Sequence, residues 1–384
     1  MRYRLWWAAA ALSLGACAQD AIAPSAAKIA DQPAFARGDD GENEQEGGAG
    51  VYTLSNDATS NGAIAFARAS DGQLSPAGTF TTGGRGSGGG LGSQGAVALS
   101  ENGRLLYAVN AGSDDITSFR VTDNGLVRVA TISSGGTRPI SIATGHGLLY
   151  VLNAGGSGNI TGFRASTGGG LEAIPNSTRA LSSGASAPAQ VGLTPNGRVL
   201  VVTEKATNRI TTYRLDGGTP GAPIVNASAG QTPFGFTFDR QGLLIVSEAF
   251  GGAANASAAS SYLVDADGTL AVVSASVPTT ETAACWFVVT KNGRFAYTTN
   301  TGSASVSGYS VNDGALRLLD ASGRTGNTDP GPLDAALSAN SRYLYVQTGT
   351  GSINTFLVDK RSGALSAVPG VSGLPASTVG LAAR

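Results

Sequence analysis

The sequence is poor in the residues that most often carry catalysis. It has one histidine, His146, two cysteines, Cys17 and Cys285, and no G-x-S-x-G motif. His146 lies in a tight turn before an apolar strand, where a Ser-His-Asp triad is not expected to assemble. One histidine together with Cys285, which lies in an apolar strand, cannot supply a zinc site. These absences exclude serine-hydrolase and zinc chemistry of the common kinds.

Charge is also scarce, and its two signs are balanced. Charged residues make up 13% of the chain, and the formal net charge is -1. Nucleic-acid-binding proteins carry a basic excess, so we expect no nucleic-acid partner. Glycine, in contrast, is abundant, with 56 residues. Abundant glycine with few charges indicates many turns between sheets that pack face to face.

A hairpin-like sequence recurs seven times. The clearest copy, GRLLYAVNAGSDDITSFRV from Gly103, reads as an apolar strand, a polar turn and a second strand. Equivalent positions, spaced 43 to 55 residues apart, are Tyr52, Tyr107, Tyr150, Val201, Ile245, Tyr297 and Tyr345. A period of this length without helices is typical of a propeller with four-stranded blades.

The two ends of the repeat array predict closure. The copy that starts at Val51 lacks the first strand of a blade, and Thr378–Ala382 has the pattern of that missing strand. A C-terminal strand that joins the first blade would remove the open sheet edges. We therefore predict an all-β, seven-bladed propeller over residues 51–384, monomeric because a closed ring needs no partner. A β-sandwich or β-solenoid is the alternative.

The N-terminal residues predict export. Residues 1–16 have a basic start and an apolar run, Leu5–Leu14, that is too short to span a bilayer. They end in Leu-Gly-Ala followed by Cys17, which resembles a bacterial lipobox and implies lipidation of Cys17. An ordinary secretory signal is the alternative. Residues 17–50 are acidic and glycine-rich, and predict a disordered tether. We expect a lipid-anchored protein in the outer membrane or periplasm of a Gram-negative bacterium.

Polar residues recur where the predicted strands approach the central channel. In a propeller, the start of each first strand and the end of each second strand lie on one face. The ends of second strands are Asn110, Asn153, Glu204, Glu248 and Asn300. The starts of first strands are Gln94, Arg138, Gln190, Gln231, Glu281 and Asp334. We expect these side chains to form a polar, partly acidic funnel in which a ligand binds.

The charged side chains of this funnel suggest two kinds of function, one for the carboxylates and one for the basic residues. The carboxylates Glu204, Glu248 and Glu281 can act as general bases or hold a cation such as calcium. Basic side chains that can balance them or hold an anionic substrate are Arg138, Lys205 and Arg209. A solvated ring that only hydrogen-bonds to neighbouring loops is the structural alternative.

The glycine-rich segment Gly83–Gly92 contains a G-x-G-x-x-G match at Gly84, Gly86 and Gly89. It opens no helix and belongs to no βαβ unit, so it does not predict a dinucleotide site. We expect it to be a flexible connection between blades.

The hairpins resemble a known family. The repeat count, the C-terminal closure, LLIVSEAFGG from Leu243 and TAACWFVVTKNGRFAYTTNTGSASVSGY from Thr282 are similar to the lactonase-type seven-bladed propellers. That family includes propeller 6-phosphogluconolactonases and fungal carboxymuconate cycloisomerases. The resemblance implies an acid/base role for Glu248 and a substrate-binding role for Arg138. It also implies a funnel histidine where this chain has Gln190, which can orient a carbonyl but cannot transfer a proton.

Two functional hypotheses follow. The first is an exported lactonase or cycloisomerase that acts on a sugar or carboxymuconate-type lactone, with Glu248 and Gln190 catalytic. Its substrate-binding residues would be Arg138, Glu204, Glu281, Asn153 and Asn300. A variant of it uses a metal on the glutamates. The second, motivated by the missing histidine, is a non-catalytic surface lipoprotein that binds a glycan or a protein.

Overall fold

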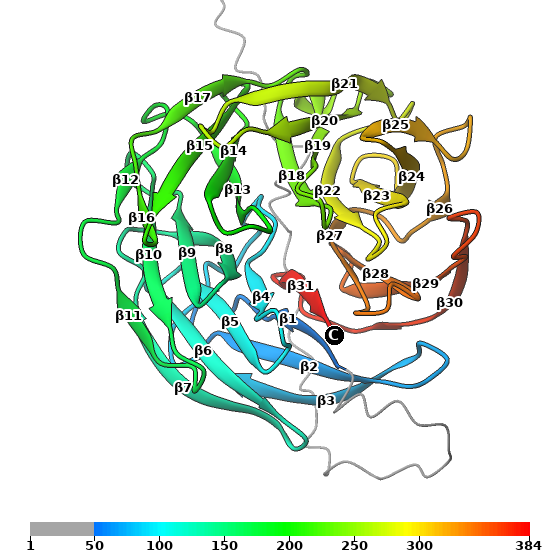
Figure 1. The fold of residues 1–384 in the computed structure, drawn as a ribbon. Coiled ribbons are helices and arrows are strands. Elements are labelled where there is room, and N and C mark those ends of the chain that lie inside the picture. Colours follow the sequence, from blue (N-terminus) through cyan, green and yellow to red (C-terminus); the bar gives the residue numbers. More distant parts are fainter. Residues whose placement is uncertain (1–49) are drawn as a thin grey trace, which may run out of the picture.

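The computed structural model describes residues 50–384. The predicted signal peptide, the lipidation site Cys17 and the tether lie outside the described residues. Residues 50–384 form seven antiparallel sheets arranged around a central axis (Figure 1). Their one helical element is the short 3-10 turn η2 (Phe250–Gly252). The predicted all-β, seven-bladed propeller is confirmed.

Each blade runs from an inner strand at the axis to an outer strand at the rim. Blade 1 consists of β31 (Val379–Ala383), β1 (Gly50–Leu54), β2 (Gly62–Arg68) and β3 (Leu74–Thr81). Blade 2 consists of β4 (Val97–Leu99), β5 (Leu105–Asn110), β6 (Asp115–Thr122) and β7 (Gly125–Ser133). Blade 3 consists of β8 (Pro139–Gly145), β9 (Leu148–Asn153), β10 (Asn159–Ala165), β11 (Leu171–Ala173) and β12 (Arg179–Ala180). Blade 4 consists of β13 (Pro188–Leu193), β14 (Val199–Glu204), β15 (Arg209–Asp216), β16 (Thr219–Pro220) and β17 (Ile224–Ala227).

The remaining three blades follow in chain order. Blade 5 consists of β18 (Pro233–Phe238), β19 (Leu244–Glu248), β20 (Ala258–Val264) and β21 (Leu270–Pro278). Blade 6 consists of β22 (Ala284–Val289), β23 (Phe295–Asn300), β24 (Ser305–Asn312), β25 (Ala315–Leu318) and β26 (Gly326–Asn327). Blade 7 consists of β27 (Pro332–Leu337), β28 (Tyr343–Thr348), β29 (Ser352–Val358) and β30 (Leu365–Ser372). In blades 3, 4 and 6 the outer strand is broken into two pieces that pair with the same third strand.

The C-terminal strand closes the ring as predicted. β31 pairs with β1 in antiparallel register, with Ala382 opposite Tyr52 and Val379 opposite Leu54 (Figure 1). Blade 1 therefore combines its inner strand from the end of the chain with three strands from its start, which leaves no open blade edge at the axis.

The second strand of each blade is the most deeply buried. β5, β9, β14, β23 and β28 are buried at every position, because neighbouring blades cover both of their faces. Their recurrent tyrosines also bond across to the next blade. The hydroxyl of Tyr150 donates to the carbonyl of Gly218 at 2.6 Å, and that of Tyr297 donates to the carbonyl of Gly363 at 2.8 Å. The repeat is visible in the sequence because the blades share a buried second strand, in which a tyrosine hydroxyl often bonds to the next blade.

The connection between β3 and β4 is bound to inner strands at its end, through Ser93 and Gln94, and the expected flexibility of residues 83–92 stays a prediction. The Gln94 side-chain amide makes two bonds to the backbone of Phe287 in β22, at 3.0 and 3.1 Å. Ser93 accepts from the indole N–H of Trp286 at 3.0 Å and donates its hydroxyl to the carbonyl of Ile140 at 2.8 Å. We call residues 90–95 the plug segment, since it lies against inner strands of blades 3 and 6.

In the part of the chain that the structure describes, no helix has the length and apolarity needed to cross a bilayer.

Candidate functional site

The predicted polar funnel does not form at the ends of the second strands. The side chains there are wholly buried, with an exposed fraction of 0% for Asn110, Asn153, Glu204, Glu248 and Asn300. Their hydrogen-bond partners belong to the same blade, to the loop before it or, for Asn110, to Asn61 of the preceding blade. Their predicted contacts with a substrate stay predictions that this placement does not favour.

Glu248, at the end of β19, is held by three donors. Its carboxylate accepts from the Gly230 N–H at 2.8 Å, the Ser260 hydroxyl at 2.5 Å and the Ser276 hydroxyl at 2.6 Å. Burial raises the pKa of this carboxyl above its ordinary value, and the three hydrogen bonds act in the opposite direction. All of its partners belong to blade 5 or to the loop before it, so the carboxylate connects strands and does not face a cavity. Its predicted catalytic role stays a prediction.

Glu204 occupies the same place in blade 4. Its carboxylate accepts from the Ser182 N–H at 2.9 Å, the Thr211 hydroxyl at 2.7 Å and the Thr207 hydroxyl at 3.0 Å. The Ser182 hydroxyl also donates to it. Glu204 and Glu248 therefore share one structural task, which is to bind the second strand of a blade to the third strand and to the loop that returns to the axis.

The asparagines at this position do the same with their amide N–H groups. The Asn300 side chain donates to the hydroxyls of Ser305 and Ser307 at 3.0 and 2.8 Å. The Asn153 side chain donates to the Asn159 carbonyl oxygen at 2.8 Å and to the Ser134 backbone carbonyl at 3.2 Å. For Asn300, Asn110 and Glu204, one partner is a Ser or Thr of the third strand, two positions beyond the residue that faces the side chain in the register.

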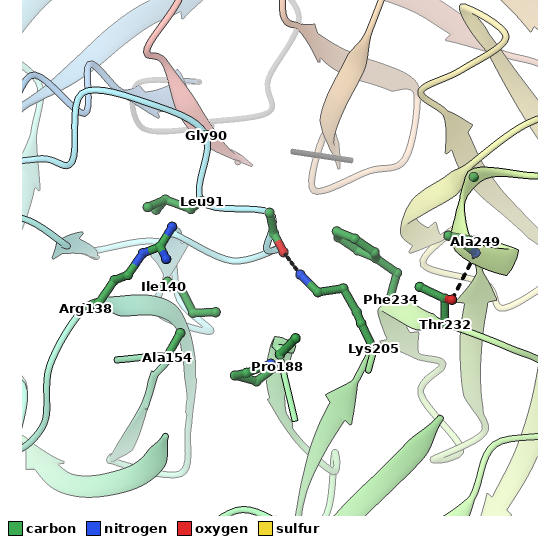
Figure 2. A pocket seen from close by; sticks show the side chains of 14 residues that line it. Gly90, Leu91, Arg138, Ile140, Ala154, Pro188, Lys205, Thr232, Phe234 and Ala249 are labelled. Carbon is green, nitrogen blue, oxygen red and sulfur yellow. Dashed lines mark hydrogen bonds between the residues drawn. The ribbon is translucent and has the colours of Figure 1, made fainter. Parts of the chain in front are cut away.

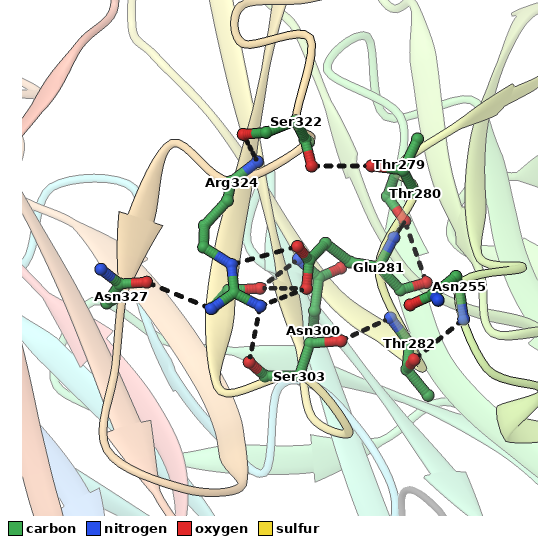
Figure 3. A network of polar contacts seen from close by, with 12 residues as sticks. Asn255, Thr279, Thr280, Glu281, Thr282, Asn300, Ser303, Ser322, Arg324 and Asn327 are labelled. Carbon is green, nitrogen blue, oxygen red and sulfur yellow. Dashed lines mark hydrogen bonds and ion pairs between the residues drawn. The ribbon is translucent and has the colours of Figure 1, made fainter.

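Glu281 belongs to a separate network at the start of blade 6, which Figure 3 shows. Arg324 donates to its carboxylate through Nε at 3.1 Å and through Nη2 at 3.0 Å, and Ser305 donates at 3.1 Å. Burial raises the pKa of the Glu281 carboxyl, but the bonds from Arg324 and the serines outweigh it and leave the pKa below its ordinary value. Glu281 is thus a paired, ionised carboxylate. Its partner Arg324 was not among the residues predicted from sequence.

Gln190 and Asp334, which start inner strands, also bond to backbone. The Gln190 side chain donates to the Phe236 carbonyl at 2.9 Å and accepts from the Phe236 N–H at 2.6 Å, and so joins blades 4 and 5. Asp334 accepts from the N–H groups of Ala335 and Leu381 at 2.8 and 3.1 Å, and its burial raises the pKa well above the ordinary value. The role of Gln190 in orienting a lactone carbonyl stays a prediction.

A cavity of about 350 Å³ lies between the plug segment and the mouths of blades 3, 4 and 5 (Figure 2). Its lining is mostly apolar or glycine. The residues that line it are Gly90, Leu91, Gly92, Arg138, Ile140, Ala154, Ala187, Pro188, Lys205, Thr232, Phe234, Ala249, Gly251 and Gly252. Two of these side chains carry a positive charge, Arg138 and Lys205, and none is a carboxylate or a histidine. The electrostatics of the cavity therefore favour an anion.

Lys205 is half-buried and points to the plug segment, as Figure 2 shows. Its ammonium donates to the carbonyl of Gly92 at 2.6 Å and lies 4.5 Å from the ring centroid of Phe234. Burial, together with the charge of Arg138, lowers the pKa of Lys205 to about 8. Among the described residues, no carboxylate pairs with this ammonium. Lys205 can therefore exchange its proton near neutral pH.

Arg138 occupies a backbone position that recurs in the repeat. The residue just before the inner strand has a left-handed φ in five blades, at Arg138, Ala187, Thr232, Ala283 and Gly331. Glycine adopts this conformation without strain, whereas a β-branched residue such as Thr232 does so at a cost of order 1 kcal/mol or more. Two residues of this set have polar side chains, Arg138 and Thr232, and both line the cavity.

In blades 3, 4 and 5, the residue that follows the buried polar side chain at the end of the second strand, which we call the anchor, lines the cavity. Ala154 follows Asn153, Lys205 follows Glu204 and Ala249 follows Glu248, and all three line it. Successive side chains of a strand point to opposite sides, so an anchor directed into the blade places the next residue at the mouth. Three of the five anchors, Asn110, Glu204 and Asn300, bond to a Ser or Thr seven positions later, at Thr117, Thr211 and Ser307.

The glutamates do not assemble into a metal site. Across residues 50–384, the structure has no group of three or more His, Cys, Asp or Glu side chains placed to hold an ion. Glu204, Glu248 and Glu281 instead lie in separate networks within blades 4, 5 and 6.

Comparison with known proteins agrees with this fold. A family model for the lactonase seven-bladed β-propeller matches residues 59–181, about a third of the chain. The resemblance to that family predicted from sequence is therefore confirmed over residues 59–181. A search of curated proteins gives no match.

Several solved structures share the architecture at low sequence identity. A provisionally named 6-phosphogluconolactonase of Bacteroides uniformis is 17% identical, with a TM-score of 0.68, and covers 87% of this chain and 99% of its own. The periplasmic gluconolactonase PpgL of Pseudomonas aeruginosa is 17% identical, with a TM-score of 0.65, and covers 85% and 98%. A protein of Lactobacillus plantarum is 18% identical, with a TM-score of 0.71, and covers 88% and 99%. At such identity these likenesses concern the fold alone.

Proposed function

We propose that this propeller is a lactonase that acts on a small lactone bearing a negative charge, bound in the cavity between the plug segment and blades 3 to 5. One observation carries the proposal: two cationic side chains, Arg138 and Lys205, line a cavity whose lining has no carboxylate. The family match and the names of two structural neighbours supply the reaction class, which is an argument by analogy.

In this proposal Lys205 is the general base. Its neutral Nζ takes a proton from a water molecule while the water oxygen attacks the lactone carbonyl carbon. The tetrahedral intermediate then collapses, the bond from the carbonyl carbon to the ring oxygen breaks, and the Lys205 ammonium returns the proton to that oxygen. The product is an open hydroxy acid, and Lys205 is neutral again.

The other residues of the cavity bind and position. Arg138 forms a charge-assisted pair with the acidic group of the substrate. The hydroxyl of Thr232 accepts from the Gly251 N–H at 3.0 Å and retains its own hydrogen for the substrate. Glu204 is a positioning residue, because it fixes the strand end from which Lys205 projects.

The test compares Lys205→Met with the matched surface variant Lys291→Met on acidic sugar lactones, muconolactones and a neutral lactone. A general base contributes about 10²–10⁴-fold, so Lys205→Met should lose at least about a hundred-fold while Lys291→Met retains the wild-type rate. An arm with EDTA tests the cation that the sequence left open. Equal rates for wild type and Lys205→Met would refute the role of Lys205.

A second function, binding without catalysis, is favoured by one observation: the cavity lining contains neither a histidine nor a carboxylate. It predicts that acidic ligands raise the melting temperature of the protein, although no lactone is turned over. The turnover screen separates the two functions.

We also propose that the protein is exported and lipid-anchored at Cys17, on the basis of the N-terminal sequence. Metabolic labelling with a radioactive fatty acid should mark the wild type and not Cys17→Ser. Equal labelling of both would contradict this anchor.

A further inference from the structure

We propose that Lys205 is a carbonyl-capturing amine, whose Nζ forms an imine with a small oxo-carboxylic acid held in the cavity by Arg138. This activity goes beyond lactone hydrolysis. It shares the cavity with the proposed function but not its substrate, so either can hold without the other.

The first support is the access and freedom of the amine. Lys205 lines a cavity of about 350 Å³, which is large enough for a small organic acid. Its nitrogen has one polar partner, the Gly92 carbonyl at 2.6 Å, and one ring contact, Phe234 at 4.5 Å. A neutral amine keeps its lone pair while it donates one hydrogen to Gly92. The lone pair can therefore attack a carbonyl carbon from the cavity.

The second support is the composition of the walls. Leu91, Ile140, Pro188 and Phe234 surround the amine with apolar groups, and Arg138 is the one other charged side chain in the lining. Desolvation and a nearby cation are the two arrangements that make a lysine nucleophilic. With the pKa lowered to about 8, the neutral fraction at pH 7.5 exceeds that of an ordinary lysine by a factor on the order of a hundred.

The covalent step balances without a further reactant. The amine nitrogen bonds to the carbonyl carbon, and a proton moves from nitrogen to the carbonyl oxygen to give a carbinolamine. Loss of the hydroxyl and the second amine hydrogen as water gives the carbon–nitrogen double bond. No oxidant or reductant is consumed, and water reverses the reaction.

Arg138 defines the class of carbonyl compound. Its guanidinium matches a carboxylate bidentately, and the cavity offers no negative group that would repel one. A carbonyl next to a carboxylate would therefore be captured in preference to a neutral carbonyl of the same size. Glyoxylate is the smallest probe of this kind, and acetaldehyde is its neutral counterpart.

The chain makes a clean experiment possible because it has only four lysines, Lys28, Lys205, Lys291 and Lys360. The full-length protein is incubated with glyoxylate and cyanoborohydride, which reduces any imine to a stable secondary amine, and the adducts are located by peptide mass spectrometry. Lys291 and Lys360 are exposed and serve as internal references. We expect Lys205 to be labelled about ten-fold faster than either at pH 7.

Two comparisons make the result specific. Arg138→Met should reduce the labelling of Lys205 by glyoxylate more than its labelling by acetaldehyde. The proposal is overturned if Lys205 of the wild type is labelled no faster than Lys291 and Lys360. This comparison uses the wild-type protein alone, so it does not depend on the folding of a variant. Labelling without lactone turnover would refute the lactonase alone, and turnover without labelling would refute the imine alone.

Discussion

Replacing Glu248 by alanine should destabilise the propeller by about 3 kcal/mol, whereas Glu248→Gln should stay within about 1 kcal/mol of wild type at pH 7. Alanine removes the acceptor for the Gly230 N–H and for the hydroxyls of Ser260 and Ser276. Three bonds to a carboxylate contribute roughly 1.5 kcal/mol or more each, and relief from burying the charge offsets part of that loss.

Glutamine keeps most of these contacts. Its amide oxygen can accept from Gly230 and Ser260, and its amide nitrogen can donate to the Ser276 hydroxyl, which rotates to accept. It also removes a carboxyl whose pKa burial raises in the folded state. Between the ordinary pKa and the raised one, the folded protein binds more protons than the unfolded chain, so wild-type stability falls as pH rises through that window. Glu248→Gln lacks this pH-dependent loss, so its stability relative to wild type should increase from pH 4 to pH 7.

Urea unfolding of the three proteins at pH 4 and pH 7 measures these differences. For a propeller of this size, 3 kcal/mol corresponds to a fall in melting temperature of about 4 °C, which calorimetry resolves. The reasoning is refuted if Glu248→Gln loses as much stability as Glu248→Ala at pH 7. It is also refuted if Glu248→Gln becomes less stable relative to wild type as pH rises.

Three further predictions follow from the fold and the site. Removal of residues 379–384 opens blade 1, so the truncated chain should unfold at lower temperature and be cut faster by protease; unchanged resistance would contradict closure by β31. Asp334→Ala leaves the N–H groups of Ala335 and Leu381 without their acceptor and should cost about 2–4 kcal/mol in denaturant unfolding, and a cost near zero would show that water replaces the carboxylate. Lactone turnover should rise with pH and level off above about 8, because neutral Lys205 is the active form; a rate that falls over this range would exclude Lys205 as the base.

The sequence predicts the fold because the same local features recur in each blade. Buried second strands, turns with left-handed residues and the unpaired first copy at Val51 are local features, and together they fix the number of blades and their closure. The plug segment is different. Gln94 and Phe287 are 193 positions apart, and no periodic pattern connects them. The bonds that Ser93 and Gln94 make to distant inner strands could therefore not be predicted from the glycine-rich run that precedes them.

Glu204 and Glu248, predicted from the sequence to be catalytic or to hold a cation, lie next to residues that line the cavity, and the sequence named Lys205 only as a possible partner for the carboxylates or for an anion. Glu204 and Glu248 are the polar residues that stand out at the strand ends, yet they point into their blades, and Lys205 and Ala249 face the cavity. A strand reverses its side chains at every position, so an error of one residue exchanges the blade interior for the channel mouth. For Glu204, the hydroxyl residue seven positions later, Thr211, marks the inward-facing side chain, but Glu248 has Asn255 at that position. Arg138, predicted from its place before a first strand, lines the cavity, and its binding role stays a prediction.

The most direct test of the account compares Lys205→Met with Glu248→Gln on one acidic lactone that the wild type hydrolyses. Lactone hydrolysis is proposed to take place in the cavity lined by Lys205 and Arg138, whereas Glu248 stabilises its blade. We therefore predict a loss of about a hundred-fold or more for Lys205→Met and a rate within a few-fold of wild type for Glu248→Gln. Loss of turnover in Glu248→Gln, with Lys205→Met fully active, would contradict this assignment.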